Sequence, residues 1–137
     1  MSRIVILDNE AVQALRSPTH PKHNRVLSHV QVVAGRKKRA APVSLAVPTA
    51  VRVEAGWDRT APAWAFVNHL RIADIALDGT RANSAAAILD RATASVADAH
   101  IGAAIEASPD TDITVITSDP HDIRQVAKDR AITVVTI

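Results

Sequence analysis

Residues 113–130, "ITVITSDPHDIRQVAKDR", predict a strand, a turn and a helix in direct succession. The β-branched run 113–117 is typical of a buried strand. Asp119 and Pro120 are typical of a helix start, because an Asp side chain caps the first turn and Pro fits its first position. Residues 132–137, "ITVVTI", predict another strand after this helix. Short apolar strands separated by a helix indicate a parallel sheet covered on both faces.

The same alternation extends outward over the whole chain. Further strands are expected at 3–7, 41–48 and 71–77. Helical patterns cover 10–15, 22–38, 49–57, 63–70, 78–92 and 95–108, with Thr49 as the expected N-cap of the third of these. No internal repeat interrupts the pattern. The sequence therefore predicts a single α/β domain over residues 1–137, built of three layers around a mainly parallel sheet of about five strands.

Composition excludes several classes of function. The chain has 137 residues, 47% of them hydrophobic, and carries a net charge of +2, which fits a folded globular domain. It has no cysteine, which excludes disulfides, thiolate metal sites and thiol nucleophiles. No stretch of about 18 apolar residues predicts a membrane span, and the first residues are not typical of a signal peptide. We therefore expect a cytoplasmic protein with no membrane partner.

Five acidic residues follow strands or begin helices. Asp8 ends the first strand, and Asp119 and Asp122 follow the strand at 113–117. Asp98 lies in the first turn of one expected helix and Glu54 in the second turn of another. Strand carboxyl ends and helix amino ends face the same edge of a parallel α/β sheet, where ligands bind. The sequence therefore predicts that these carboxylates converge.

Each acid also has a purely structural interpretation. Asp8, Asp98, Asp119 and Asp122 can serve as helix caps or first-turn acids, with a cap contributing about 1 kcal/mol. Glu54 lies too deep in its helix for that and shares a face with apolar residues. An unpaired buried carboxylate costs several kcal/mol. Its structural alternative is pairing with the neighbouring guanidinium groups of Arg52 and Arg59.

Several carboxylates gathered within a few ångströms repel one another, and a divalent cation removes that conflict. A set of oxygen ligands with retained waters is the preference of Mg²⁺, and Mn²⁺ is expected to substitute. Such an ion activates water for attack on a phosphodiester. The acids therefore indicate metal-dependent phosphodiester hydrolysis.

The stretches "IVILD", "VPTAVRVEAG", "SVADAHIGAA" and "VITSDPHDI" occur in an order that resembles the PIN-domain family, in particular its VapC-type toxins. The resemblance spans essentially the whole chain. It implies strand order 3-2-1-4-5 and a Mg²⁺-dependent endoribonuclease that cuts RNA, is usually dimeric and is inhibited by a cognate VapB-type antitoxin. The family's metal-binding and catalytic positions correspond to Asp8, Glu54, Asp98 and Asp119, with Thr117 and Asp122 in support.

Roles follow from this resemblance as hypotheses. Asp8, Asp98 and Asp119 would bind the metal directly or through water, Glu54 would complete the shell or orient the attacking water, and Thr117 would hold Asp8 or Asp119. At Glu10 the chain departs from the Ser or Thr found in many members. Glu10 either joins the metal shell or turns outward, and the second is favoured. The stretch 91–96 also lacks an acid that many relatives carry, which bears on substrate contacts.

Basic residues and histidines are weaker candidates. RNA phosphates could be held by Arg16, Lys22, Arg25, Arg36, Lys37, Lys38 and Arg39, although a solvated loop explains the run at 36–39 equally well. The six histidines show no metal-binding spacing and are expected mostly in polar loops or on exposed helix faces. His100 is expected to point away from Asp98 on its helix.

Three other functions remain open. Asp78, in "LDG", imitates the acceptor of a receiver-like phosphoacceptor domain, but no Lys follows the last strand. A phosphoryl-transfer enzyme with a D-x-D nucleophile would need Asp where Glu10 stands. A non-catalytic PIN-like binding protein is the third alternative, against which the presence of all four main acids argues.

Overall fold

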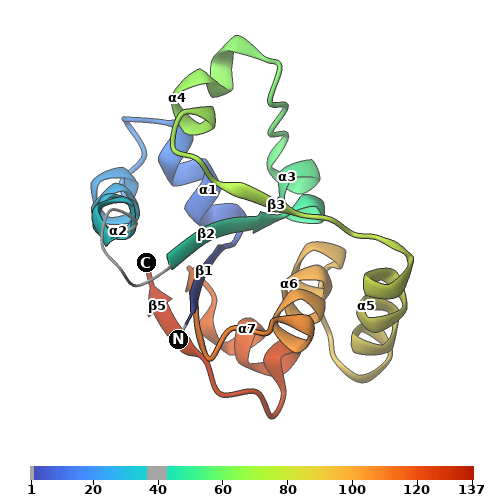
Figure 1. Ribbon diagram of the computed structural model, residues 1–137. Helices are drawn as coiled ribbons and strands as arrows, with labels where there is room; N and C mark the ends of the chain where they lie inside the picture. Colours follow the sequence, from blue (N-terminus) through green and yellow to red (C-terminus); the bar gives the residue numbers. More distant parts are fainter. Residues whose placement is uncertain (1, 37–42) are drawn as a thin grey trace.

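The computed structural model describes residues 2–36 and 43–137. Its centre is a five-stranded, wholly parallel sheet in the order β3-β2-β1-β4-β5 (Figure 1). The strands are β1 (Arg3–Leu7), β2 (Val43–Pro48), β3 (Ala73–Ile75), β4 (Asp112–Thr117) and β5 (Thr133–Thr136). The predicted fold class and strand order are both confirmed.

Helices cover both faces of this sheet. They are α1 (Asn9–Arg16), α2 (His23–Arg36), α3 (Thr49–Ala55), α4 (Ala65–Asn68), α5 (Gly79–Arg91), α6 (Val96–Ala107) and α7 (Pro120–Ala127), with a 3₁₀ turn at Pro62–Trp64. In Figure 1, α1 and α2 lie on one side of the strands, and α6 and α7 lie on the other. α5 packs against α6, and α3 contacts both α1 and α6. α3 therefore bridges elements of the two helical layers.

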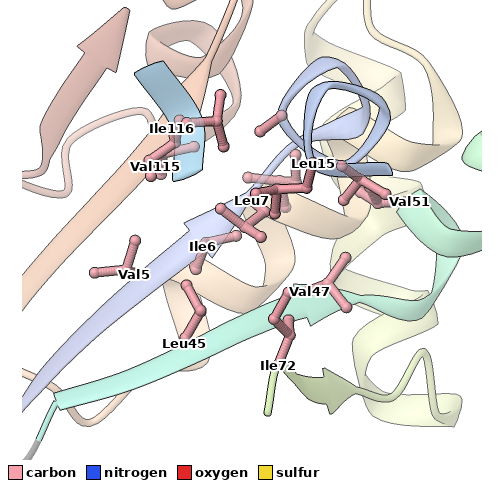
Figure 2. Close-up of a cluster of buried hydrophobic side chains, with 14 of the residues drawn as sticks. Val5, Ile6, Leu7, Leu15, Leu45, Val47, Val51, Ile72, Val115 and Ile116 are labelled. Carbon is pink, nitrogen blue, oxygen red and sulfur yellow. The ribbon is translucent and has the colours of Figure 1, made fainter. Parts of the chain in front are cut away.

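The core forms where the central strands meet the helices of the first layer. Ile6 and Leu7 of β1 are fully buried, as expected for a strand with a neighbour on each side and helices on each face. Figure 2 shows the side chain of Leu7 beside that of Leu15 from α1 and close to that of Val51 from α3. Leu7 pairs in register with Ile116 of β4, which brings the ends of the two strands together.

α6 is buried on almost every side, because it lies between the sheet, α5 and α7. Gly102 permits this close packing. A Cβ at that position would lie 2.7 Å from Ile88 Cδ1 and 2.8 Å from the Val126 carbonyl oxygen. The apolar sequence of this helix therefore reflects burial between elements rather than a single apolar stripe.

Among the helices whose first residues are described, four begin with a side-chain cap, whereas α3 has none. Asp8, Asp78, Ser95 and Asp119 each accept a hydrogen bond from a backbone N–H in the first turn of α1, α5, α6 and α7 respectively. The expectation that Thr49 caps α3 is wrong. Pro48 holds the cap position without a side-chain bond, and the Thr49 hydroxyl oxygen accepts from Leu77 N at 3.2 Å.

Other boundaries also differ from the expectations. α3 ends at Ala55 because Gly56 adopts a left-handed conformation with φ of 71°. The helical pattern at 63–70 divides into the 3₁₀ turn and the short α4. Positions 37–42, including the end of the expected helix 22–38 and the start of the expected strand 41–48, lie outside the described residues. Within the described ranges, no helix combines the length and apolarity needed to cross a membrane.

Two tryptophans hold the segment after α3 against the first layer. The rings of Trp57 and Trp64 stack with centroids 5.6 Å apart. The guanidinium of Arg59 lies over Trp57 at 4.5 Å and that of Arg16 over Trp64 at 5.1 Å. Aromatic and cation–π contacts of this kind stabilise a segment that has little regular structure of its own.

Candidate functional site

The candidate site lies at the carboxyl end of the two central strands. Asp8 follows β1 directly, and Thr117 is the last residue of β4. The Asp8 amide donates a hydrogen bond to the Ile116 carbonyl at 3.2 Å, which extends the β1–β4 ladder by one step. The parallel arrangement thus brings to one edge two residues that are far apart in sequence.

Asp8 is the most buried carboxylate of the site, with 7% of its surface exposed. Its Oδ1 accepts from Ala11 N at 2.9 Å, which is the helix cap, and its Oδ2 accepts from Ser118 N at 3.3 Å. Burial raises the pKa of Asp8, although hydrogen bonds from the Thr117 hydroxyl and the two amides oppose this. The cap and the site role are compatible, because one oxygen caps α1 while the other faces β4.

Thr117 connects Asp8 to the start of α7. Its side chain is fully buried, and its hydroxyl oxygen accepts from Asp119 N at 2.9 Å. Asp119 in turn caps α7 by accepting from Asp122 N at 3.3 Å. Contact with the Asp119 side chain is the main cause of a raised pKa at Asp122. The structure therefore brings these two acids together, and Thr117 contacts both of the residues that it was expected to hold.

The raised pKa of Asp98 is the clearest indication that several carboxylates lie close together. Asp98 lies half-buried in the first turn of α6, where Ser95 Oγ accepts from its backbone N–H at 3.0 Å. Burial is the first cause that raises the pKa of Asp98, to about 6, followed by the negative charge of Asp122. The charges of Glu54 and Asp8 act in the same direction. Acids from four separate segments therefore share one electrostatic environment.

Glu54 is exposed, so the expectation that it lies on a buried face is wrong. Its expected structural partners are also wrong, because Arg52 and Arg59 both pair with Asp74, at 3.3 and 2.8 Å. Glu54 Oε1 instead accepts from Asn9 Nδ2 at 3.3 Å. The carboxylate of Glu54 is thus tied to α1 next to Asp8, and not to the nearby guanidinium groups.

Glu10 contacts the loop after α1. Its Oε1 lies 3.0 Å from His20 Nε2 and 3.9 Å from Lys22 Nζ. The His20 ring accepts from Lys22 N through Nδ1, so Nε2 carries the proton that it shares with Glu10. These contacts favour the outward-turned alternative for Glu10.

Sequence reasoning missed two residues at this edge of the sheet. Asn9 orients Glu54, and its own Oδ1 is buried with no hydrogen-bond partner in the described part of the chain. His100 is fully buried, and its Nδ1 accepts from Ala50 N at 3.2 Å. Burial lowers the pKa of His100, which keeps the ring neutral. Only the apolar neighbours of His100 in sequence signalled that it enters the core.

His23, like His100, is an exception to the expectation that most histidines lie in polar loops or on exposed helix faces. This side chain is buried, and its Nδ1 lies 2.7 Å from the Ala14 carbonyl oxygen, so it donates there as a structural bond between α1 and α2. Neither His23 nor His100 is a surface residue.

Among the basic residues proposed for RNA contact, the three whose side chains are described have different surroundings. Arg16 is exposed and lies over Trp64, Lys22 lies beside Glu10, and Arg25 is exposed on α2. α2 ends at Arg36, and Lys37, Lys38 and Arg39 lie outside the described residues. RNA contact by this set stays a prediction.

An open, largely apolar pocket of about 370 Å³ adjoins Glu54. It is lined by Thr49, Ala50, Val53, Glu54, Leu77, Val96 and Ala97. Ala97 is the neighbour of Asp98, so the pocket opens beside the acids. A concave surface next to polar, electrostatically perturbed groups is the usual setting of a binding site.

The donor set fits a hard divalent cation in its chemistry. Its side chains offer only carboxylate and hydroxyl oxygens, which Mg²⁺ and Mn²⁺ prefer. As their side chains are placed, no three acidic or histidine residues in ranges 2–36 and 43–137 form a group that could hold a metal ion. Metal binding here would therefore require the side chains to rotate, and the exposed Glu54 and Asp119 have room to do so.

Comparison with known proteins adds no relative: no family model and no curated protein matches this chain.

Proposed function

We propose that this chain is a Mg²⁺-dependent endoribonuclease of the PIN type, the toxin of a toxin–antitoxin pair that acts in the cytoplasm. The observation that carries the proposal is the convergence of Asp8, Glu54, Asp98 and Asp122 from four separate segments at the carboxyl end of the sheet, and the raised pKa of Asp98 agrees with it. Uncompensated carboxylates at the carboxyl end of a parallel sheet are a costly arrangement, and they are characteristic of a functional site.

The burial and hydrogen bonds of each acidic residue indicate its role in the proposed reaction. Asp8 is fixed by three hydrogen bonds and provides the least mobile ligand. Asp98 and Asp119 provide further ligands from the first turns of α6 and α7. Glu54, exposed and held on one side by Asn9, is suited to receive a proton from the attacking water or to complete the ligand set.

Mg²⁺ bound by these acids would activate water and neutralise negative charge that develops on the phosphate. The protein's own contribution is to hold the carboxylates in place. Thr117 does this for Asp8 and Asp119, and the apolar core beneath keeps Asp8 from solvent.

Two partners follow from the resemblance to VapC-type toxins: a VapB-type antitoxin and a second copy of this chain. The exposed apolar side chains Val32, Val53, Phe66, Leu89 and Val96 offer surface for such contacts. The substrate is RNA.

Two observations count against the receiver-like alternative. The strand order 3-2-1-4-5 differs from the order 2-1-3-4-5 of receiver-type sheets. Asp78 lies beyond the edge strand β3, where its side chain caps α5 by accepting from Arg81 N at 2.9 Å. Neither feature suits a central phosphoacceptor.

Incubation of the purified chain with total cellular RNA over a Mg²⁺ or Mn²⁺ titration tests the proposal, with co-purification of the partner if the free chain is toxic. We expect discrete cleavage that EDTA stops, and a loss of at least a hundredfold in rate for Asp8→Asn and Asp98→Asn. Asp90→Asn, an exposed residue of α5, is the matched control and should cleave normally. Metal-independent cleavage, or full activity of both site variants, would refute the proposed chemistry.

A further inference from the structure

The first backbone N–H groups of α3 have no hydrogen-bond acceptor within the helix or from the side chain at its cap position. The first N–H groups of a helix lack partners within the helix. Pro48 precedes α3 and has no side-chain acceptor, while the Thr49 hydroxyl is engaged with Leu77 N. The Ala50 amide is therefore left to an acceptor from outside the helix.

That acceptor is the imidazole of His100. Its Nδ1 lies 3.2 Å from Ala50 N, and the residue has no exposed surface. A ring nitrogen that accepts from an amide carries no proton, so the proton of the neutral ring is on Nε2. Nε2 makes no hydrogen bond of good geometry to any described residue. The Ala50 contact is thus the hydrogen bond of good geometry that orients this buried ring, and a weaker interaction with the Ala76 backbone, which acts to raise the pKa of His100, supports it.

The contact joins two helices that carry acids of the site. Ala50 and Glu54 lie one turn apart on the same side of α3. Asp98 lies within the same helical turn of α6 as His100. The hydrogen bond at this point therefore links the helix that carries Glu54 to the helix that carries Asp98.

We infer that His100 is a positioning residue that caps α3 from within α6 and so fixes Glu54 against Asp98. The claim that His100 caps α3 rests only on the hydrogen bond from Ala50 N to its Nδ1. The claim that this positions Glu54 for catalysis rests on the proposed ribonuclease function. His100 does not touch substrate or metal in this role. Its chemical requirement is a single acceptor at the position of Nδ1.

Two substitutions separate that requirement from simple packing. His100→Asn places an amide oxygen near the position of Nδ1, whereas His100→Leu fills the space without an acceptor. His29→Leu, on α2, is the control for the same chemical change away from the site. Circular dichroism and thermal melts establish that each variant is folded before comparison.

The first measurement is by NMR on the folded proteins. Long-range ¹H–¹⁵N spectra of the wild type should show Nδ1 unprotonated. We expect protection of the Ala50 amide from hydrogen exchange to fall roughly tenfold in His100→Leu and to be retained in His100→Asn. Equal protection in wild type and His100→Leu, or a proton on Nδ1, overturns the inference whatever the activity of the protein.

The second measurement is Mg²⁺-dependent RNA cleavage. We expect His100→Leu to lose about tenfold in kcat with KM little changed, and His100→Asn to restore most of the rate. If the wild type cleaves no RNA, the proposed function fails, and the exchange data still judge the capping contact. If it cleaves and His100→Asn is as impaired as His100→Leu, the positioning role is wrong while the ribonuclease stands.

Discussion

At the scale of single residues, Asp98 is ionised at neutral pH against the burial of its carboxylate and the charges of three other acids. Its pKa of about 6 lies above the ordinary value of 3.8. For a group whose pKa is raised on folding, the contribution to stability is complete below the unfolded pKa and is lost as pH rises through the folded value. The metal-free protein should therefore lose stability between about pH 4 and pH 6.

Asp98→Asn should remove this loss. At pH 8 in EDTA we expect the variant to exceed the wild type in free energy of unfolding by about 1–2 kcal/mol, allowing for solvent screening of a half-buried group. At pH 4 the difference should shrink to near zero. Urea denaturation at the two pH values measures this, with Asp90→Asn as the control. A wild type more stable than Asp98→Asn at pH 8 would contradict the electrostatic account.

The Thr117 hydroxyl stabilises the site by hydrogen-bonding both the Asp8 carboxylate and the Asp119 backbone amide. Thr117→Val keeps the shape of the side chain but leaves Asp119 N–H without its partner and removes one of the three hydrogen bonds to the Asp8 carboxylate. Losing buried partners in this way costs about 1–3 kcal/mol. We expect that destabilisation in thermal or urea unfolding, together with weaker Mg²⁺ binding. Thr117→Ser retains the hydroxyl and should stay within about 1 kcal/mol of the wild type; equal effects of Val and Ser would point to packing instead.

At the scale of elements, the strands were predictable because each buried strand has a continuous apolar run. β1 and β4 match their expected bounds to within one residue. The start of α3 was not predictable, because Thr49 has the local chemistry of a cap and only the distant Leu77 amide and His100 ring decide otherwise. The partners of Glu54 were missed for the same reason, since Asp74 draws Arg52 and Arg59 away across a long sequence separation.

The packing of α6 against α5 and α7 depends on the missing side chain of Gly102. An added methyl would lie 2.8 Å from the Val126 carbonyl oxygen and 2.9 Å from Val126 Cβ, neither of which is a flexible chain end. We expect Gly102→Ala to destabilise the fold by about 1–3 kcal/mol, because overpacking outweighs the better helix propensity of Ala. Gly79→Ala is the matched control, since a Cβ there meets no atom within 4 Å. Urea unfolding of both variants checks this. Equal free energies of unfolding for Gly102→Ala and Gly79→Ala would mean that α5 and α7 shift to accommodate the added methyl group at little cost.

At the scale of the whole molecule, the parallel strand order brings acids that are dispersed in the sequence to one edge of the sheet. Asp8, Glu54, Asp98 and Asp119 come from four separate segments, and each also has a local structural role or a surface position. The order β3-β2-β1-β4-β5 places the ends of β1 and β4 side by side, with the first turns of α6 and α7 beside them. The sequence could indicate this convergence, whereas the side-chain directions depended on the packed structure.

Metal binding should therefore be coupled to both folding and pH. Ligation by carboxylates requires their ionised forms, and the pKa values of Asp8 and Asp98 are raised. At pH 8, Mg²⁺ at a hundred times its Kd should add about 2.7 kcal/mol to the free energy of unfolding. At pH 5 the same Mg²⁺ concentration should add clearly less, because protons compete for the ligands. Thermal or urea unfolding with and without Mg²⁺ measures both effects. Asp98→Asn should lose most of the gain at pH 8 and Asp90→Asn should keep it, so an equal gain in the two variants would place the ion elsewhere on the molecule.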